Sequence, residues 1–146
     1  MSDRPLADEV WRAMASLVLD NRDGWRRTVV EKTGLPFTRV RILRRLERQS
    51  MTMKAIAEAT ALDAPAATVA VSDLERRGLV VRRVDPDNRR CKQVSLTDDG
   101  RRLMAAIAEL DDPAPAALAA LDEADLRSLR GILQKVAGAE EVSEGT

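Results

Sequence analysis

The segment from Leu74 to Gly100 constrains the fold more than any other part of the chain. Its first five residues, Leu-Glu-Arg-Arg-Gly, predict the end of a helix, because glycine readily forms a left-handed C-cap and arginine suits the negative end of the helix dipole. Residues 79–84 are rich in valine, and Val94 and Leu96 alternate with polar residues, so both runs predict half-buried strands. Asp-Pro-Asp-Asn at 85–88 has turn chemistry, and Thr97 predicts the N-cap of a following helix. The segment therefore predicts a helix, a β-hairpin and a second helix.

Length and composition narrow the class of protein. A chain of 146 residues is expected to form one domain with a substantial core. No apolar run approaches the length that spans a bilayer and no signal peptide opens the chain, so we expect a cytoplasmic protein without membrane contact. One cysteine excludes an internal disulfide, and the lack of histidine excludes histidine-based metal and nucleophile sites. We accordingly predict no metal, no cofactor and no enzymatic activity.

Charge is unevenly distributed along a chain whose net charge is zero. Residues 1–35 balance at six basic and six acidic side chains. Residues 36–92 contain thirteen basic and seven acidic side chains, whereas residues 93–146 contain five and eleven. The basic middle segment indicates a region that binds a polyanion.

Hydrophobic spacing and capping residues predict helices at about 6–32, 37–48, 52–60, 64–77, 98–120 and 122–138. Pro113 and Pro115 must kink or split the fifth of these, and Gly24 weakens the first. The fold class is mainly α with a small β-hairpin wing, a winged helix-turn-helix with N- and C-terminal dimerisation helices. The expected organisation is a single domain over 1–146, with the winged helix-turn-helix at about 36–100, dimerisation helices at about 1–35 and 101–138, and a flexible acidic tail at 139–146.

The fourth predicted helix has two different faces. Asp63 is its expected N-cap, and Ala67, Val71 and Leu74 share a face that should be buried. The opposite face carries Pro65, Thr68, Val69, Ser72 and Arg76. In a helix-turn-helix this outward face is the one presented to the DNA major groove.

Basic side chains are concentrated on the predicted wing, at Arg82, Arg83, Arg89, Arg90 and Lys92. Their spacing suits contact with DNA phosphates, and the alternative is solvated charge on a hairpin. Cys91 lies between two of them, where a reactive thiol would suit an oxidant sensor, although an incidental surface thiol is the simpler interpretation.

The same residues resemble the MarR family of bacterial transcription regulators. The wing signature of that family, Asp-x-Arg followed by Val-x-Leu-Thr-x-x-Gly, is matched in register by Asp87, Arg89, Val94, Leu96, Thr97 and Gly100. Its Leu-Glu-x-x-Gly-Leu-Val lead-in is matched by Leu74, Glu75, Gly78, Leu79 and Val80. The order of predicted elements extends the resemblance over nearly the whole chain.

The resemblance implies a homodimeric repressor that binds a palindromic operator in double-stranded DNA. It makes Arg89 the minor-groove arginine and Asp87 its positioning partner. It also implies release by a small aromatic or apolar anionic effector, for which Trp11 and Arg41 are the candidate contacts. The candidate DNA-binding residues are Pro65, Thr68, Val69, Ser72, Arg76, Arg83, Asp87, Arg89, Arg90 and Lys92.

One departure from the family pattern affects this interpretation. Val69 stands where relatives often have arginine or another polar residue, and Asp63 stands where serine is common. The outward face then has few groups that could bind a base edge bidentately. A winged-helix module that binds protein and has no specific DNA site is therefore the alternative function.

Overall fold

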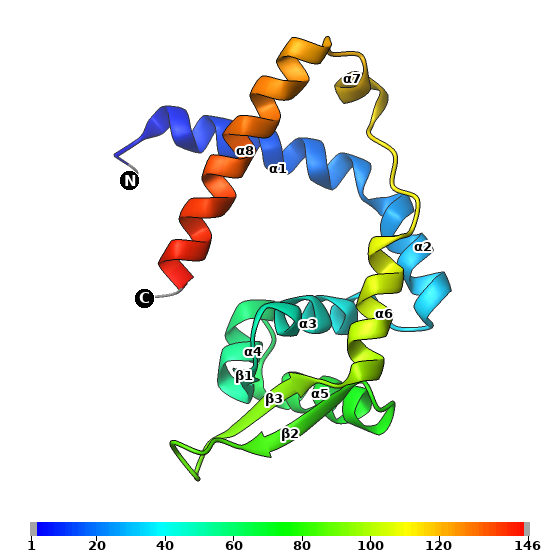
Figure 1. Cartoon of the computed structure of the whole chain (residues 1–146), viewed down its shortest axis with the longest axis vertical. Coiled ribbons are helices and arrows are strands. Elements are labelled where there is room, and N and C mark those ends of the chain that lie inside the picture. The colour runs from blue at the N-terminus through cyan, green and yellow to red at the C-terminus, as the bar shows by residue number, and fades with distance from the viewer. Residues whose placement is uncertain (1–2, 145–146) are drawn as a thin grey trace. The chain divides into compact units, whose positions relative to one another are not determined.

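The computed structural model describes residues 3–144 and the side chains of residues 3–140 (Figure 1). The chain divides into two compact units, Met1–Asp111 and Asp112–Thr146. The first unit contains the helices α1 (Pro5–Asn21), α2 (Asp23–Thr33), α3 (Phe37–Arg48), α4 (Met53–Thr60), α5 (Ala64–Arg76) and α6 (Asp98–Ala108). It also contains the strands β1 (Met51–Thr52), β2 (Val80–Val84) and β3 (Lys92–Leu96). The second unit contains α7 (Ala116–Ala119) and α8 (Glu123–Glu144).

A hydrophobic core holds α2 to α6 and the sheet together. Val71 and Leu74 of α5 are fully buried, as are Ile42 and Leu43 of α3 and Val94 of β3. Ala67 is also buried, so the predicted inner face of α5 is confirmed. The helix order followed by a hairpin confirms the predicted winged helix-turn-helix fold class.

The sheet is antiparallel, with the strand order β1-β3-β2. Val80 pairs with Leu96 and Val84 pairs with Lys92, so β2 and β3 form the expected hairpin. The sequence pattern missed β1, where Met51 pairs with Val94. β1 is only two residues long, so it shows no alternation of apolar and polar residues. It forms because the start of the helix-turn-helix lies beside β3.

Local capping chemistry places the helix starts. The side chains of Thr52, Asp63 and Thr97 accept hydrogen bonds from the backbone N–H groups of Ala55, Ala66 and Gly100 at 3.1, 2.8 and 3.1 Å. Asp122 accepts in the same way from Asp125 N at 2.8 Å, before α8. These bonds satisfy N–H groups that have no partner inside the helix.

Two expected boundaries were wrong, and one expected split was confirmed. The helix expected over 6–32 is two helices, because the chain breaks at Arg22 rather than at Gly24. The helix expected over 98–120 is split, as Pro113 and Pro115 predicted: α6 ends at Ala108, and α7 follows the two prolines, which cannot donate helical hydrogen bonds. The last helix continues past Gly138 to Glu144, so the expected flexible tail is helical over 139–144, while residues 145–146 lie outside the described part. Across the described residues, no helix is long and apolar enough to cross a membrane.

Candidate nucleic-acid interface

Helix α5 presents an exposed face beside the turn that connects it to α4. The turn is tight because Ala61 adopts a left-handed conformation and Leu62 N donates to Ala57 O at 3.0 Å. Pro65, Thr68, Val69 and Arg76 are all exposed, as their predicted outward positions require. Ser72 is half-buried instead, because the wing covers part of it.

The wing is attached to α5 by Arg82. Its Nη2 donates to Ser72 Oγ at 2.8 Å, and its Nε lies 3.6 Å from Glu75 Oε1. Arg82 is therefore half-buried and ties β2 to α5, rather than projecting freely with the other wing arginines. This bond links the outward face of α5 to the base of the wing.

Asp73 is a buried carboxylate that pairs with three arginines, and the sequence pattern did not predict this cluster. Arg39 Nε of α3 donates to its Oδ2 at 2.8 Å and Arg77 Nε donates to the same oxygen at 3.0 Å, while Arg76 pairs with Oδ1. The Arg39 guanidinium lowers the pKa of Asp73 most, against the opposing effect of burial, and Arg77 and Arg76 lower it further. The sequence did contain one sign of this cluster. Asp73 lies three positions after buried Ala70, and Arg76 and Arg77 follow it at the i+3 and i+4 spacings that bring side chains together on a helix.

The wing tip is built from side chain to backbone hydrogen bonds. Asp85 Oδ1 accepts from Asp87 N at 2.9 Å, and Asn88 Oδ1 accepts from Arg90 N at 3.2 Å. Asp85 N donates to Cys91 O at 2.9 Å, which closes the loop. The exposed basic residues of the wing are Arg83, Arg89, Arg90 and Lys92. Within the described residues, Asp87 makes no ion pair with Arg89, so the positioning role expected for Asp87 has no contact to support it in this structure.

The signature residues at the base of the wing connect α5 to α6. Gly78 has φ +76°, the left-handed conformation expected of a C-cap glycine. Thr97 Oγ1 donates to Gly78 O at 2.6 Å, and Thr97 N donates to Leu79 O at 3.1 Å. A Cβ at Gly100 would lie 2.2 Å from Leu79 O, which no side chain permits. The Gly, Thr and Gly of the signature are therefore structural residues that hold the hairpin in place.

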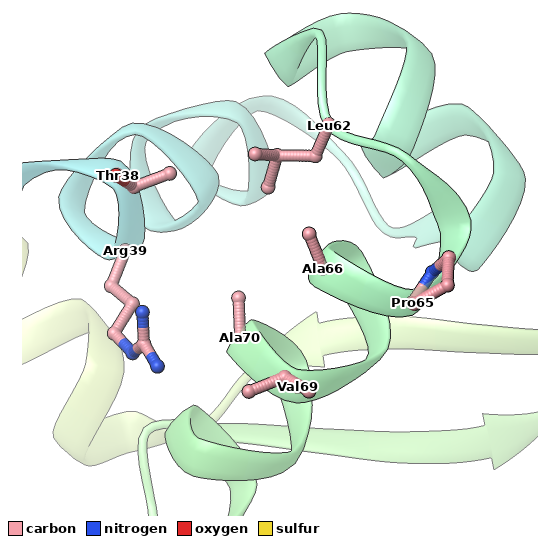
Figure 2. Close-up of a pocket in the computed structure, with 7 residues that line it drawn as sticks. All are labelled: Thr38, Arg39, Leu62, Pro65, Ala66, Val69 and Ala70. Carbon is pink, nitrogen blue, oxygen red and sulfur yellow. The ribbon is translucent and has the colours of Figure 1, made fainter.

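A groove of about 430 Å³ runs between α5 and the start of α3. Figure 2 shows Ala66, Val69 and Ala70 on the side of α5, with Thr38 and Arg39 on the side of α3. Leu62 and Pro65 complete a lining that is mostly apolar. Neither Trp11 nor Arg41, the residues expected to contact an effector, lines this groove.

The remaining candidates lie apart from this surface or show no special chemistry. Trp11 is exposed on α1, and Arg41 is exposed on α3. Trp25, the second tryptophan of the chain, packs edge-on against Phe37 at the edge of the core, with ring centroids 5.8 Å apart. Cys91 is a half-buried free thiol whose Sγ lies 3.4 Å from Asn88 Nδ2. No group of metal-binding side chains occurs among residues 3–140.

Comparison with known proteins agrees with this geometry. The sequence model described as the MarR family matches residues 33–90, which include α3 to β2 and most of the wing tip. A MarR-family transcriptional regulator from Rhodococcus sp. RHA1 is 27% identical, with a TM-score of 0.62 over 92% of this chain and 96% of that one. No curated protein sequence matches the chain.

Two mutant structures of MepR, a transcription regulator from Staphylococcus aureus, share the fold at 21% identity. The mutant from a multidrug-resistant clinical isolate has a TM-score of 0.71 and covers 90% of this chain and 96% of its own. The other mutant, which is bound to an oligodeoxyribonucleotide, has a TM-score of 0.57 and covers 91% and 96%. Members of the matching family are transcription regulators and not enzymes. Residues 33–90 of the chain therefore match the MarR family, and the chain has the winged helix-turn-helix fold of MarR-family transcription regulators.

Proposed function

We propose that this protein is a homodimeric, ligand-responsive repressor that binds a palindromic operator in double-stranded DNA. In this proposal α5 enters the major groove and the wing tip reaches the flanking minor groove. The observation that carries it is the 2.8 Å bond from Arg82 to Ser72, which links the exposed face of α5 to the wing. A bond between the two elements helps to hold them at the separation that reading two grooves requires.

The exposed basic side chains support DNA as the partner. Arg83, Arg89, Arg90 and Lys92 lie on the wing, and no ion pair involves any of these four among the described residues. Their charge is therefore free to replace the counterions of phosphates, which is the main source of affinity for duplex DNA. Arg89, near the tip, has the reach for a narrow minor groove.

The apolar surface of α1 supports a homodimer. None of the seventeen residues of α1 is buried, and its apolar side chains include Trp11 at 67% exposure and Val18 at 53%. Ile132, Leu133 and Val136 of α8 are also exposed. Apolar surface of this extent marks an association site, and a two-fold dimer pairs each such face with its own copy.

In this proposal, a small ligand releases the protein from DNA. A small aromatic anion would have to bind more tightly to the dimer in which the two recognition helices are wrongly spaced for DNA, since equal affinity shifts nothing. Trp11 and Arg41 remain the proposed contacts, an aromatic face and a cation exposed on the chain. Thermal shift with aromatic acids, followed by DNA binding in the presence of each hit, tests this part separately.

The deciding experiment is a mobility shift with the promoter of the protein's own gene. A dimer that contacts about 6–10 phosphates should lose roughly 10³–10⁵ in affinity between 50 and 200 mM salt. Arg90→Ala should weaken binding, whereas Arg127→Ala is the matched control, because Arg127 is an exposed arginine of α8 that pairs with Glu123. A DNA affinity that does not change with salt concentration, or that falls equally in both variants, would favour the protein-interaction alternative.

A further inference from the structure

The exposed face of α5 is apolar in the turns that a recognition helix presents to base edges. Val69 is 63% exposed, and its neighbours Pro65 and Ala66 are exposed as well. On the basis of the DNA binding proposed above, we propose that Val69, supported by Pro65 and Ala66, selects thymine by packing against the C5 methyl group in the major groove. Val69 then determines sequence specificity through an apolar contact rather than a hydrogen bond.

The same face has few side chains that could read bases through hydrogen bonds. The side chains that bind bases bidentately are arginine, lysine, asparagine and glutamine, and residues 64–75 contain none of them. Arg76 follows in the last turn, where it pairs with Asp73. Thr68 Oγ1 donates its proton to Ala64 O at 2.9 Å, and Ser72 Oγ accepts from Arg82. Each of these hydroxyl groups thus already makes one hydrogen bond inside the protein, which leaves Thr68 only as an acceptor and Ser72 with one proton to donate.

The thymine methyl is the apolar group that duplex DNA displays in the major groove, and the minor groove displays no counterpart. The groove beside Val69 extends the apolar surface from Pro65 and Ala66 to Leu62 and Ala70 (Figure 2). A methyl group placed against Val69 would meet carbon on more than one side and lose its contact with water. Removing that contact should cost about 0.8 kcal/mol, which is roughly fourfold in affinity per methyl.

The test uses the full-length protein and duplexes enriched from a random pool by this protein. Each thymine of the enriched half-site is replaced in turn by uracil, which lacks only the C5 methyl, and affinity is measured by fluorescence anisotropy. We expect one or two positions per half-site where uracil lowers affinity about fourfold, and about 15-fold when both half-sites are changed. In the uracil duplexes, each cytosine next to the replaced thymine is then changed to 5-methylcytosine. Affinity should return only where the new methyl group reaches Val69.

Two variants assign the effect to a residue. Val69→Ala should bind the thymine and uracil duplexes equally, and its far-UV circular dichroism should match the unchanged protein, because Val69 is exposed. Val84→Ala is the matched control, since Val84 is an exposed valine of β2 in the wing and should leave the preference for thymine intact.

The outcomes separate this inference from the function on which it rests. Tight, salt-dependent binding with no position sensitive to uracil would overturn the thymine contact and leave the DNA-binding function standing. Sensitivity that survives Val69→Ala would overturn the assignment to Val69. If the protein enriches no duplex at all, the proposed function fails, and the inference fails with it.

Discussion

Gly100→Ala should destabilise the protein, although alanine normally favours a helix over glycine. An added Cβ would lie 2.2 Å from Leu79 O and 3.2 Å from a methyl carbon of Leu96, so the start of α6 and the end of the hairpin must separate. Overpacking of a fixed site costs about 1–3 kcal/mol, and strain on the Thr97 bond to Gly78 would add about 1 kcal/mol. We therefore expect a loss of roughly 2–4 kcal/mol in the free energy of unfolding.

The measurement is urea unfolding followed by far-UV circular dichroism, with all variants at the same protein concentration because the stability of the proposed dimer would depend on it. Gly24→Ala is the matched control, since Gly24 also lies in the first turn of a helix and a Cβ there meets nothing within 4 Å. It should be neutral or stabilising by up to about 1 kcal/mol. A Gly100→Ala protein as stable as this control would refute the close approach of Leu79 to α6 as the reason for the glycine.

Three further predictions concern charge, readout and assembly. Because Arg39 and its neighbours lower the pKa of Asp73 below 3.8, its ionised form stabilises the fold above that pH and the contribution is lost as pH falls through the lowered value. Asp73→Asn should therefore be less stable at pH 7, and urea melts should show the difference narrowing in acid; a constant difference would contradict this. Arg89→Ala should weaken operator binding more than Thr68→Ala and flatten the preference for A·T at the outer flanks, measured by fluorescence anisotropy, and the reverse ranking would return the main role to α5. Val10→Glu, on the exposed apolar face of α1, should shift the protein towards monomer in sedimentation velocity, and an unchanged dimer would place the interface elsewhere.

The sequence alone determined most of the secondary structure of the DNA-binding region. The ends of α3, the inner face of α5 and the two hairpin strands follow from hydrophobic period, and the caps at Thr52, Asp63 and Thr97 follow from single side chains. These signals act within about four residues of one another, so the local sequence contains them completely. The local pattern was wrong at one helix end, because the first helix breaks at Arg22 rather than at a glycine.

Only the tertiary structure decided which side chains meet across the fold. Asp73 binds Arg39 from 34 residues away, and Arg82 reaches Ser72 from the wing. Both pairings depend on how α3, α5 and β2 pack, and no periodicity in a single element encodes that distance. Packing also explains why Gly100 must be glycine, since the constraint is the carbonyl of Leu79 and not the conformation of its own helix. The sequence showed that Val69 departs from the family pattern. Only the folded chain showed that Val69 lies beside an apolar groove and that the nearby Thr68 and Ser72 hydroxyls each make a hydrogen bond inside the protein.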